Sequence, residues 1–276
     1  MGKNCRNIEP LVLWINIRGG LIRVHPVLID LGTVKIYSWG FMLAVAVLVA
    51  IVGISKIFKE EGYDPEKVLD MVIILVVTGL LGSRLAYVAL YEWGDFLVHP
   101  GIFFGLTGGG FSGLVWYGGF TASVVAFVIY VRQQGYSFWK MADIFSPFLA
   151  LAYAVVRIGC FLNGCCYGKV SESACTVVFP FVDGLSRYPT QLYSSAINFV
   201  LFAVLLWYYP RRKFSGQIFI YYLLGYSVYR FIIEIFRENW VFYGSFSVSQ
   251  VYSLVLLAVG MGLYFWRRFT VERLGE

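Results

Sequence analysis

Arginine recurs inside the apolar segments of this chain, where its charge and hydrogen-bond donors make it the strongest candidate for a functional residue. Arg84, Arg157 and Arg230 lie in or near hydrophobic stretches. A charge at the centre of a membrane helix costs at least about 2.5 kcal/mol, so such an arginine normally faces a polar cavity or a partner. A guanidinium matches phosphate with two parallel hydrogen bonds. The three arginines therefore indicate a buried anionic ligand, and a phospholipid headgroup is the most available phosphate at that depth.

The segment around Arg230 repeats polar residues at helical spacing. Tyr226, Arg230, Glu234 and Arg237 recur at i, i+4, i+8 and i+11, so they share one helix face. Arg230 and Glu234 are also spaced for a simple i,i+4 ion pair. Three arginines against one nearby carboxylate still leave a surplus of positive charge for a ligand.

Cysteines follow Arg157 closely. The chain has five, namely Cys5, Cys160, Cys165, Cys166 and Cys175. The odd number, and the direct succession of two of them, give no readable disulfide framework. Both histidines are remote in sequence, and adjacent cysteines are poorly spaced for a tetrahedral metal site. We therefore expect no metal and favour a structural role for these thiols, with a redox or disulfide role and a metal site as the alternatives.

Composition places the chain among integral membrane proteins. Its 276 residues are 59% hydrophobic and only 14% charged, and the mean hydropathy is +0.72, far too apolar for a soluble domain of this length. A helix needs about 20 apolar residues to cross the bilayer. Seven windows of this kind occur, at about 37 to 57, 68 to 91, 113 to 132, 142 to 163, 190 to 209, 215 to 236 and 247 to 266. The prediction is an all-α polytopic membrane protein with about seven transmembrane helices, folded as one integral membrane domain over residues 1–276.

Three segments outside these windows have features that predict their structure. Residues 1–36 form a predicted extracytoplasmic N-terminal segment, in which 26–37 alternate around Leu31 and Gly32 as in a hairpin. Residues 105–113 are too rich in glycine for a helix and are expected to line a cavity. Residues 169–188 form a long connection in which 177–181 is either a short strand or a loop dipping into the membrane interface. These connections predict a small extracytoplasmic head.

Orientation follows from lysine and arginine in the loops. Seven spans place eleven such residues on one side: Lys56, Lys59, Lys67, Arg132, Lys140, Arg211, Arg212, Lys213, Arg267, Arg268 and Arg273. The other side has three: Lys169, Arg187 and Arg237. The C-terminus is therefore predicted to be cytoplasmic and the N-terminus outside, although five basic residues in the N-terminal tail oppose this bias. The net charge of +6 fits a basic face against anionic lipid, and nothing requires nucleic acid.

Several motifs in their order resemble one enzyme family. The segment Arg157-Ile-Gly-Cys-Phe-Leu-Asn163-Gly resembles the signature Gly-Arg-x-Gly-Asn-Phe-x-Asn-Gly-Glu of the prolipoprotein diacylglyceryl transferases. Further matches are His25-Pro-Val-Leu-Ile, Ile36-Tyr-Ser-Trp-Gly40, Gly82-Ser-Arg-Leu-Ala-Tyr87, Tyr117-Gly-Gly, Tyr188-Pro-Thr-Gln-Leu-Tyr193, Tyr226 to Arg237 and Phe246-Ser-Val-Ser-Gln250. Each is weak alone, but together they cover about residues 25 to 268.

The resemblance implies an activity. Members of this family transfer the diacylglyceryl group of phosphatidylglycerol to the lipobox cysteine of a bacterial prolipoprotein, forming a thioether and releasing glycerol 1-phosphate. They are multi-pass proteins of the bacterial cytoplasmic (inner) membrane, and no cofactor is implied. The acceptor protein supplies the reacting thiol, so no catalytic cysteine of the enzyme is required.

The resemblance also implies site residues. The expected catalytic residues are Arg157, Arg230 and Tyr117. The expected substrate-binding residues are Arg84, Asn163, Tyr226, Glu234, Gly118 and Gly119. Arginines beside the donor phosphate would neutralise charge that grows on the leaving group.

The chain departs from the family pattern at five positions. Tyr117 stands for a histidine, Cys160 for the first signature asparagine, Cys165 for the glutamate, Trp39 for a tyrosine and Val156 for a glycine. The phenol of Tyr117, with an ordinary pKa near 10, is a poor replacement for a histidine base unless arginines lower that pKa. We favour retained transferase activity. The alternatives are a non-catalytic or differently specific lipid-binding relative, and a transporter of anionic solutes.

Overall fold

The computed structural model describes residues 13–17, 20–24, 26–30, 35–104, 113, 115–173, 176–179, 183–237, 241–243 and 246–274. His25, Cys5, Cys175 and the glycine-rich loop from 105 to 112 lie outside these residues. The chain divides into two compact units, a larger one of Met1–Gly53 and Ala142–Glu276 and a smaller one of Ile54–Met141. Each unit is described in turn.

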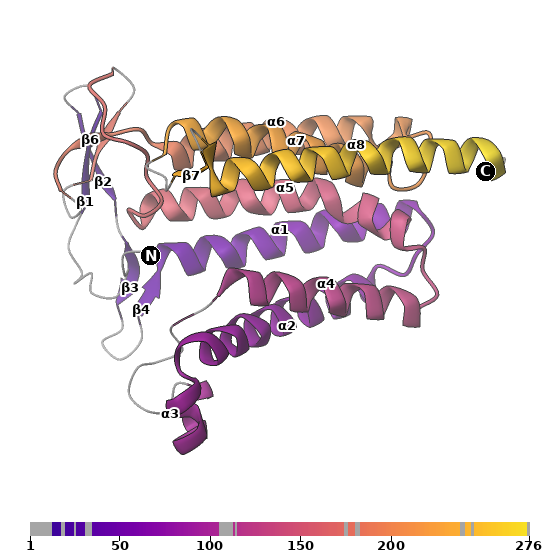
Figure 1. Cartoon of the computed structure of the whole chain (residues 1–276), viewed down its shortest axis with the longest axis horizontal. Coiled ribbons are helices and arrows are strands. Elements are labelled where there is room, and N and C mark those ends of the chain that lie inside the picture. The colour runs from indigo at the N-terminus through magenta and orange to yellow at the C-terminus, as the bar shows by residue number, and fades with distance from the viewer. Residues whose placement is uncertain are drawn as a thin grey trace. The chain divides into compact units, whose positions relative to one another are not determined.

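Long apolar helices build the larger unit (Figure 1). They are the first part of α1 (Ser38–Glu60), most of α5 (Phe138–Leu162), and the whole of α6 (Thr190–Tyr208), α7 (Gln217–Ile235) and α8 (Val248–Leu274). α7 packs on both α6 and α8. The predicted windows match these helices closely, because each contains a predominantly apolar run of the length that a membrane helix requires.

Short antiparallel strand pairs occupy the connections of this unit. They are β1 (Leu13–Ile17) with β2 (Gly20–Val24), β3 (Val27–Asp30) with β4 (Lys35–Tyr37), β5 (Val177–Val178) with β6 (Ser186–Arg187), and β7 (Val241–Tyr243) with β8 (Phe246–Ser247). The predicted hairpin over 26–37 is confirmed as β3 and β4. Of the two alternatives for the segment beginning at Val177, the strand is found, as β5.

A buried carboxylate joins α5 to the start of α7. Asp143, in the first turns of α5, is fully buried. Its two oxygens accept hydrogen bonds from the backbone N–H groups of Gly216 (2.7 Å) and Phe219 (2.9 Å). The first N–H groups of a helix have no partner inside the helix, and a carboxylate is the strongest acceptor for them. Asp143 therefore acts as an N-terminal cap supplied by a neighbouring helix.

The smaller unit contains α2 (Glu66–Tyr91), α3 (Trp93–Val98), the 3-10 turn η1 (Pro100–Phe104) and α4 (Trp116–Gln133). Small residues allow α2 and α4 to approach closely. A Cβ placed on Gly82 would lie 2.4 Å from the Cβ of Ala122, and one on Gly118 would lie 2.5 Å from the carbonyl oxygen of Gly82. Small residues at a membrane helix interface have this effect because they let the two backbones touch.

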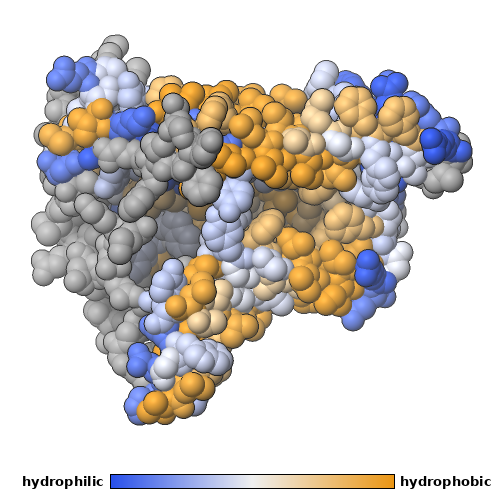
Figure 2. Space-filling view, viewed as in Figure 1, coloured by the Kyte–Doolittle hydropathy of each residue, from blue (hydrophilic) through white to orange (hydrophobic). Residues whose placement is uncertain are grey.

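Six of the helices in the described residues are long and apolar enough to cross a membrane: α1, α2, α5, α6 with its 3-10 extension η2 (Tyr209–Arg211), α7 and α8. The seventh predicted span is helical as α4, but only over 18 residues, with glycines near its start and Arg132 and Gln133 at its end. Apolar side chains such as Val52, Val200 and Phe269 remain exposed on the helices. Figure 2 shows this hydrophobic surface over α8 and the helices beside it, with hydrophilic side chains near the C-terminal end of α8. The surface is that of a multi-pass membrane protein.

Candidate active site

The site begins where α5 ends. Gly164 has φ +66, a left-handed conformation that glycine adopts without a steric cost. The N–H of Gly164 donates to the carbonyl of Phe161 (3.1 Å), and the N–H of Cys165 donates to the carbonyl of Cys160 (3.0 Å). This pair of bonds is a Schellman motif, with Asn163 as the C-cap residue after Leu162 and Gly164 as the residue that follows the cap. The Asn-Gly pair of the signature thus reverses the chain at the end of α5.

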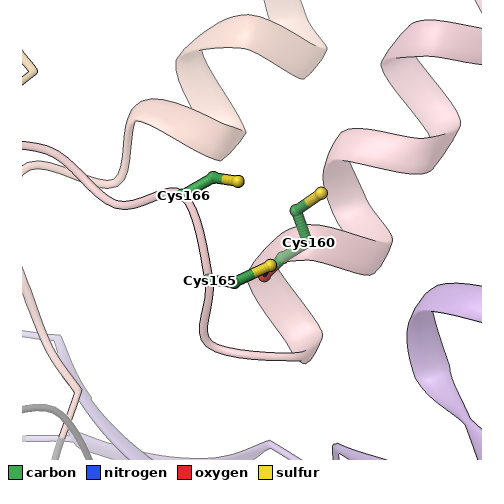
Figure 3. A group of neighbouring side chains, drawn as sticks. All are labelled: Cys160, Cys165 and Cys166. Atoms are coloured by element: carbon green, nitrogen blue, oxygen red, sulfur yellow. Dashed lines mark hydrogen bonds between the residues drawn. The ribbon is translucent and has the colours of Figure 1, made fainter. Parts of the chain in front are cut away.

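The reversal brings three cysteines together. Cys160 is on the last turn of α5, and Cys165 is the residue that a Schellman motif folds back against it. Cys166 also has a positive φ, +64, which is unusual for a residue other than glycine. All three sulfur atoms lie within 4.8 Å of one another, and Figure 3 shows the side chains converging in front of the helix end. The expectation that adjacent cysteines are badly placed for a common ligand is therefore wrong.

Hydrogen bonds from the start of α6 hold this loop. The hydroxyl of Thr190 donates to the carbonyl of Cys166 (3.0 Å), and the amide of Gln191 donates to the carbonyl of Cys165 (2.7 Å). Gly168 packs so tightly that a Cβ there would lie 2.5 Å from the carbonyl oxygen of Phe236. The loop is therefore fixed between α6 and the end of α7.

Positive charge surrounds the cysteines. Hydrogen bonds from Cys160 and Cys165 are the main reason that the pKa of the Cys166 thiol lies well below its ordinary value, and the charges of Arg157 and Arg237 lower this pKa further. Cys160 is buried, whereas Cys166 is exposed. Negative charge on the Cys166 sulfur is therefore stabilised at this end of α5.

Arg157 lies one helical turn from its main neighbour, Tyr153. Its guanidinium donates a hydrogen bond to the Tyr153 hydroxyl and lies 4.6 Å from the centre of that ring. The hydroxyl of Tyr229 on α7 donates in turn to the Tyr153 oxygen (3.3 Å). Among the described residues, Arg157 forms no ion pair with a carboxylate. A charged guanidinium in a membrane helix whose hydrogen bond, among the described residues, goes to a phenol retains donors for an anion.

Arg230 is arranged differently, because a carboxylate already holds it. Its guanidinium lies 2.6 Å from Glu234 and donates to the hydroxyl of Ser249 (2.9 Å). Glu234 is almost fully buried and also accepts a hydrogen bond from Ser247 (3.1 Å). The simple i,i+4 pair considered from the sequence is therefore present. Tyr226, one turn before Arg230, packs its ring 5.9 Å from that of Tyr153, which links the faces of α5 and α7 that bear the two arginines.

Arg84 belongs to the smaller unit, where protein oxygens surround it. Only 3% of it is exposed, and it pairs with Glu92 at 3.3 Å. It also donates to the carbonyls of Phe103 (3.0 Å), Ile102 and Gly113. These contacts hold the segment after α2 against the helix, so Arg84 has a structural role. Its predicted binding of substrate remains a proposal.

Tyr117, Gly118 and Gly119 lie on the first turn of α4, also in the smaller unit. Tyr117 is 65% exposed, and its ring packs 5.3 Å from that of Trp116. Both glycines face α2: a Cβ on Gly119 would lie 2.7 Å from the carbonyl oxygen of Gly79. Close packing of α4 against α2 therefore accounts for both glycines. Their role in substrate binding stays a prediction.

Sequence reasoning missed several residues around the arginines and cysteines. Tyr153 was detectable, since it precedes Arg157 by one helical turn. Thr190, Gln191 and Ser249 lie within segments noted only for their resemblance, and Asp143, near the other end of α5, acts across helices. No local pattern reveals such partners, because they are far apart in the chain.

Comparisons with known proteins bear on the whole chain. The family model described as prolipoprotein diacylglyceryl transferase matches residues 26–266. A phosphatidylglycerol–prolipoprotein diacylglyceryl transferase of Clostridium tetani is 34% identical over 89% of this chain and 99% of its own length. One from Clostridium perfringens, numbered 2, is 34% identical over 83% of this chain and 90% of its own. One from Listeria innocua is 31% identical over 90% and 92%. The chain therefore belongs to the prolipoprotein diacylglyceryl transferase family.

Proposed function

We propose that this chain transfers the diacylglyceryl group of phosphatidylglycerol to the lipobox cysteine of a prolipoprotein, forming a thioether and releasing glycerol 1-phosphate. The observation that carries the proposal is Arg157. It lies in a membrane-spanning helix, its contacts are with Tyr153, and among the described residues it has no carboxylate partner. Such an arginine requires an anion, and the phosphate of the donor lipid supplies one.

The two arginines of the larger unit, Arg157 and Arg230, bind the phosphate of the donor lipid in different ways. Arg157 binds the phosphate directly and stabilises the charge that grows as the carbon–oxygen bond breaks. Arg230 is oriented by Glu234 and Ser249 and offers its remaining N–H groups to the same phosphate. Tyr226 and Asn163 border the donor, and the amide of Asn163 can hydrogen-bond its glycerol oxygens.

The acceptor supplies the nucleophile, which must reach the site as a thiolate, because a free cysteine has a pKa near 8.5. The phenol of Tyr117 stands where the family presents a histidine, and it either orients the donor or accepts the thiol proton. We also propose that Arg84, Gly118 and Gly119 of the smaller unit bind substrate.

The membrane orientation of the protein is part of the proposal. In the larger unit, Arg211, Arg212 and Lys213 lie in the connection between α6 and α7, at the opposite end of these helices from the cysteine loop. Arg267 of α8 donates to the carbonyl of Ser215 in the same connection. Positive residues mark cytoplasmic ends. The C-terminus is therefore cytoplasmic. With α4 as the seventh span, the N-terminus is extracytoplasmic, and the reaction takes place at the outer surface of the bacterial inner membrane.

The test uses the purified full-length protein in detergent with phosphatidylglycerol and a lipobox peptide. Mass spectrometry of the peptide should show one added diacylglyceryl group on its cysteine. A peptide in which serine replaces that cysteine should stay unmodified. Binding of phosphatidylglycerol without an adduct would instead favour a lipid-binding relative. Flux of an anionic solute into proteoliposomes, without an adduct, would favour a transporter.

A further inference from the structure

The cysteine cluster brings three thiols close enough to share one metal ion. Cys160, Cys165 and Cys166 all carry thiols, and their sulfur atoms lie within 4.8 Å of one another. In a tetrahedral zinc site, metal–sulfur bonds of about 2.3 Å place the sulfur atoms about 3.8 Å apart. The three side chains therefore need to close by only about 1 Å to share one ion. A disulfide, in contrast, would join two of the sulfur atoms and leave the third cysteine as a thiol.

The backbone around the cluster is shaped for this convergence. The left-handed conformation of Cys166 turns its side chain toward the helix end, at a steric cost that an ordinary loop would avoid. Thr190 and Gln191 each fix one carbonyl of the cysteine pair. Hydrogen bonds of this kind hold the residues that carry metal ligands in place.

The charges around the cluster also suit a metal–thiolate centre. Three thiolates and one divalent cation carry a net charge of −1. The charges of Arg157 and Arg237 act on the cysteines and offset that negative charge in a poorly solvated place. Arg157, which we assign to the donor phosphate, thus also acts on the thiol cluster.

The reaction needs what such a centre provides. The acceptor thiol must lose its proton, and the part of the larger unit that the structure describes contains no histidine to accept it. A metal-bound thiol is deprotonated outright at neutral pH. Zinc sites with three protein ligands keep a fourth position open for water or substrate.

We propose that Cys160, Cys165 and Cys166 bind a thiophilic divalent cation such as Zn²⁺, and that the open fourth position takes the acceptor cysteine as a thiolate. The inference rests on the proposed function. An ion held by these three cysteines would lower the pKa of the acceptor thiol, whose proton would pass to solvent, and would keep the acceptor sulfur as a thiolate. That sulfur next forms a bond with the glycerol carbon of the donor while the carbon–oxygen bond to phosphate breaks. The electron pair of the broken bond leaves with glycerol 1-phosphate. Tyr117 then retains only the task of orienting the donor.

The test begins with metal binding rather than activity. The full-length protein, purified under reducing conditions and freed of metal, is titrated with Co²⁺ and in parallel with Zn²⁺. We expect about one ion per chain, with sulfur-to-cobalt charge-transfer absorption that Zn²⁺ abolishes. Cys160→Ser, Cys165→Ser and Cys166→Ser should each weaken binding, whereas Cys5→Ser should not. Absence of these bands from the wild-type protein would overturn the proposal, as would their equal strength in the Cys166→Ser variant.

The open position is tested by adding acceptor to the cobalt protein without lipid. A lipobox peptide should change the cobalt spectrum, and the same peptide with serine in place of cysteine should not. An unchanged spectrum with both peptides would refute the thiolate role.

Transfer activity is then measured separately. Removal of the metal should abolish turnover and Zn²⁺ should restore it. Full turnover by metal-free protein would overturn the metal proposal and leave the transferase function intact. Cobalt binding through the cysteines with no transfer under any metal condition would contradict the transferase function instead.

Discussion

Replacement of Arg157 by alanine should slow diacylglyceryl transfer by at least about tenfold. The guanidinium has Tyr153 as its protein partner and no carboxylate among the described residues, so its free donors are available to the donor phosphate. A hydrogen bond to a charged group contributes about 1.5 to 3 kcal/mol. Since about 1.4 kcal/mol corresponds to a tenfold change in rate, the expected loss is about 10- to 150-fold.

The loss should fall on kcat as well as on kcat/KM, because the charge on the leaving phosphate grows in the transition state. Arg157→Lys should restore only part of the rate, since an ammonium group lacks the planar fork of guanidinium. Tyr153→Phe removes the hydroxyl that accepts hydrogen bonds from Arg157 and Tyr229 but keeps the guanidinium and its charge, so the rate should fall less than in Arg157→Ala. This variant is the matched control for disturbed packing.

The assay is the initial rate of adduct formation on a lipobox peptide, measured by mass spectrometry and normalised to folded, monodisperse protein. An Arg157→Ala enzyme with nearly wild-type kcat would refute the assignment of Arg157 to the phosphate. So would a Tyr153→Phe variant that is as impaired as Arg157→Ala, because the effect would then follow the packing rather than the charge.

Four further predictions concern residues other than Arg157. Arg84→Ala breaks the ion pair with Glu92 and the hydrogen bonds to three carbonyls, so it should destabilise the protein by about 1 to 3 kcal/mol. We expect a lower temperature of thermal unfolding, whereas kcat per folded molecule should stay the same. Asp143→Ala removes the acceptor for two backbone N–H groups of α7 and should lower the unfolding free energy by about 1 to 3 kcal/mol, with Asp143→Asn in between; equal stability of all three proteins would disprove the capping role. Gly118→Val forces a side chain against the α2 backbone, and we expect a lower unfolding temperature, whereas Gly94→Ala, which has free space, should be silent. Tyr117→Phe should raise KM for phosphatidylglycerol while the pH profile of kcat stays unchanged; loss of an alkaline rise in that profile would show that the phenol acts as the base.

Much of the membrane architecture follows from the sequence because its cause is local. An apolar run of the right length must form a helix in lipid, since its backbone groups have no other partner there. The window predicted at about 68 to 91 became a helix from Glu66 to Tyr91, and that predicted at about 190 to 209 became α6. The pair of Arg230 and Glu234 was readable for the same reason, as both lie on one helix face.

The convergence of the cysteines could not be predicted, because it depends on two left-handed residues. From spacing alone, Cys165 and Cys166 look unable to serve one ion, yet Gly164 and Cys166 both have positive φ and turn the thiols toward Cys160. The partners of Arg84 were equally hidden. They are carbonyls 18 to 29 residues farther along the chain, and only the fold of the smaller unit brings them to the guanidinium.

The central claim is that one thioether forms for each phosphodiester that is cleaved. It is tested most directly in a single reaction of the purified protein with phosphatidylglycerol and a lipobox peptide, by counting both products over time. The account predicts that the diacylglyceryl peptide and glycerol phosphate accumulate in equal amounts, and that neither forms with the Arg157→Ala variant at a comparable rate. Glycerol phosphate released without the adduct, or no product from the wild-type protein at all, would contradict it.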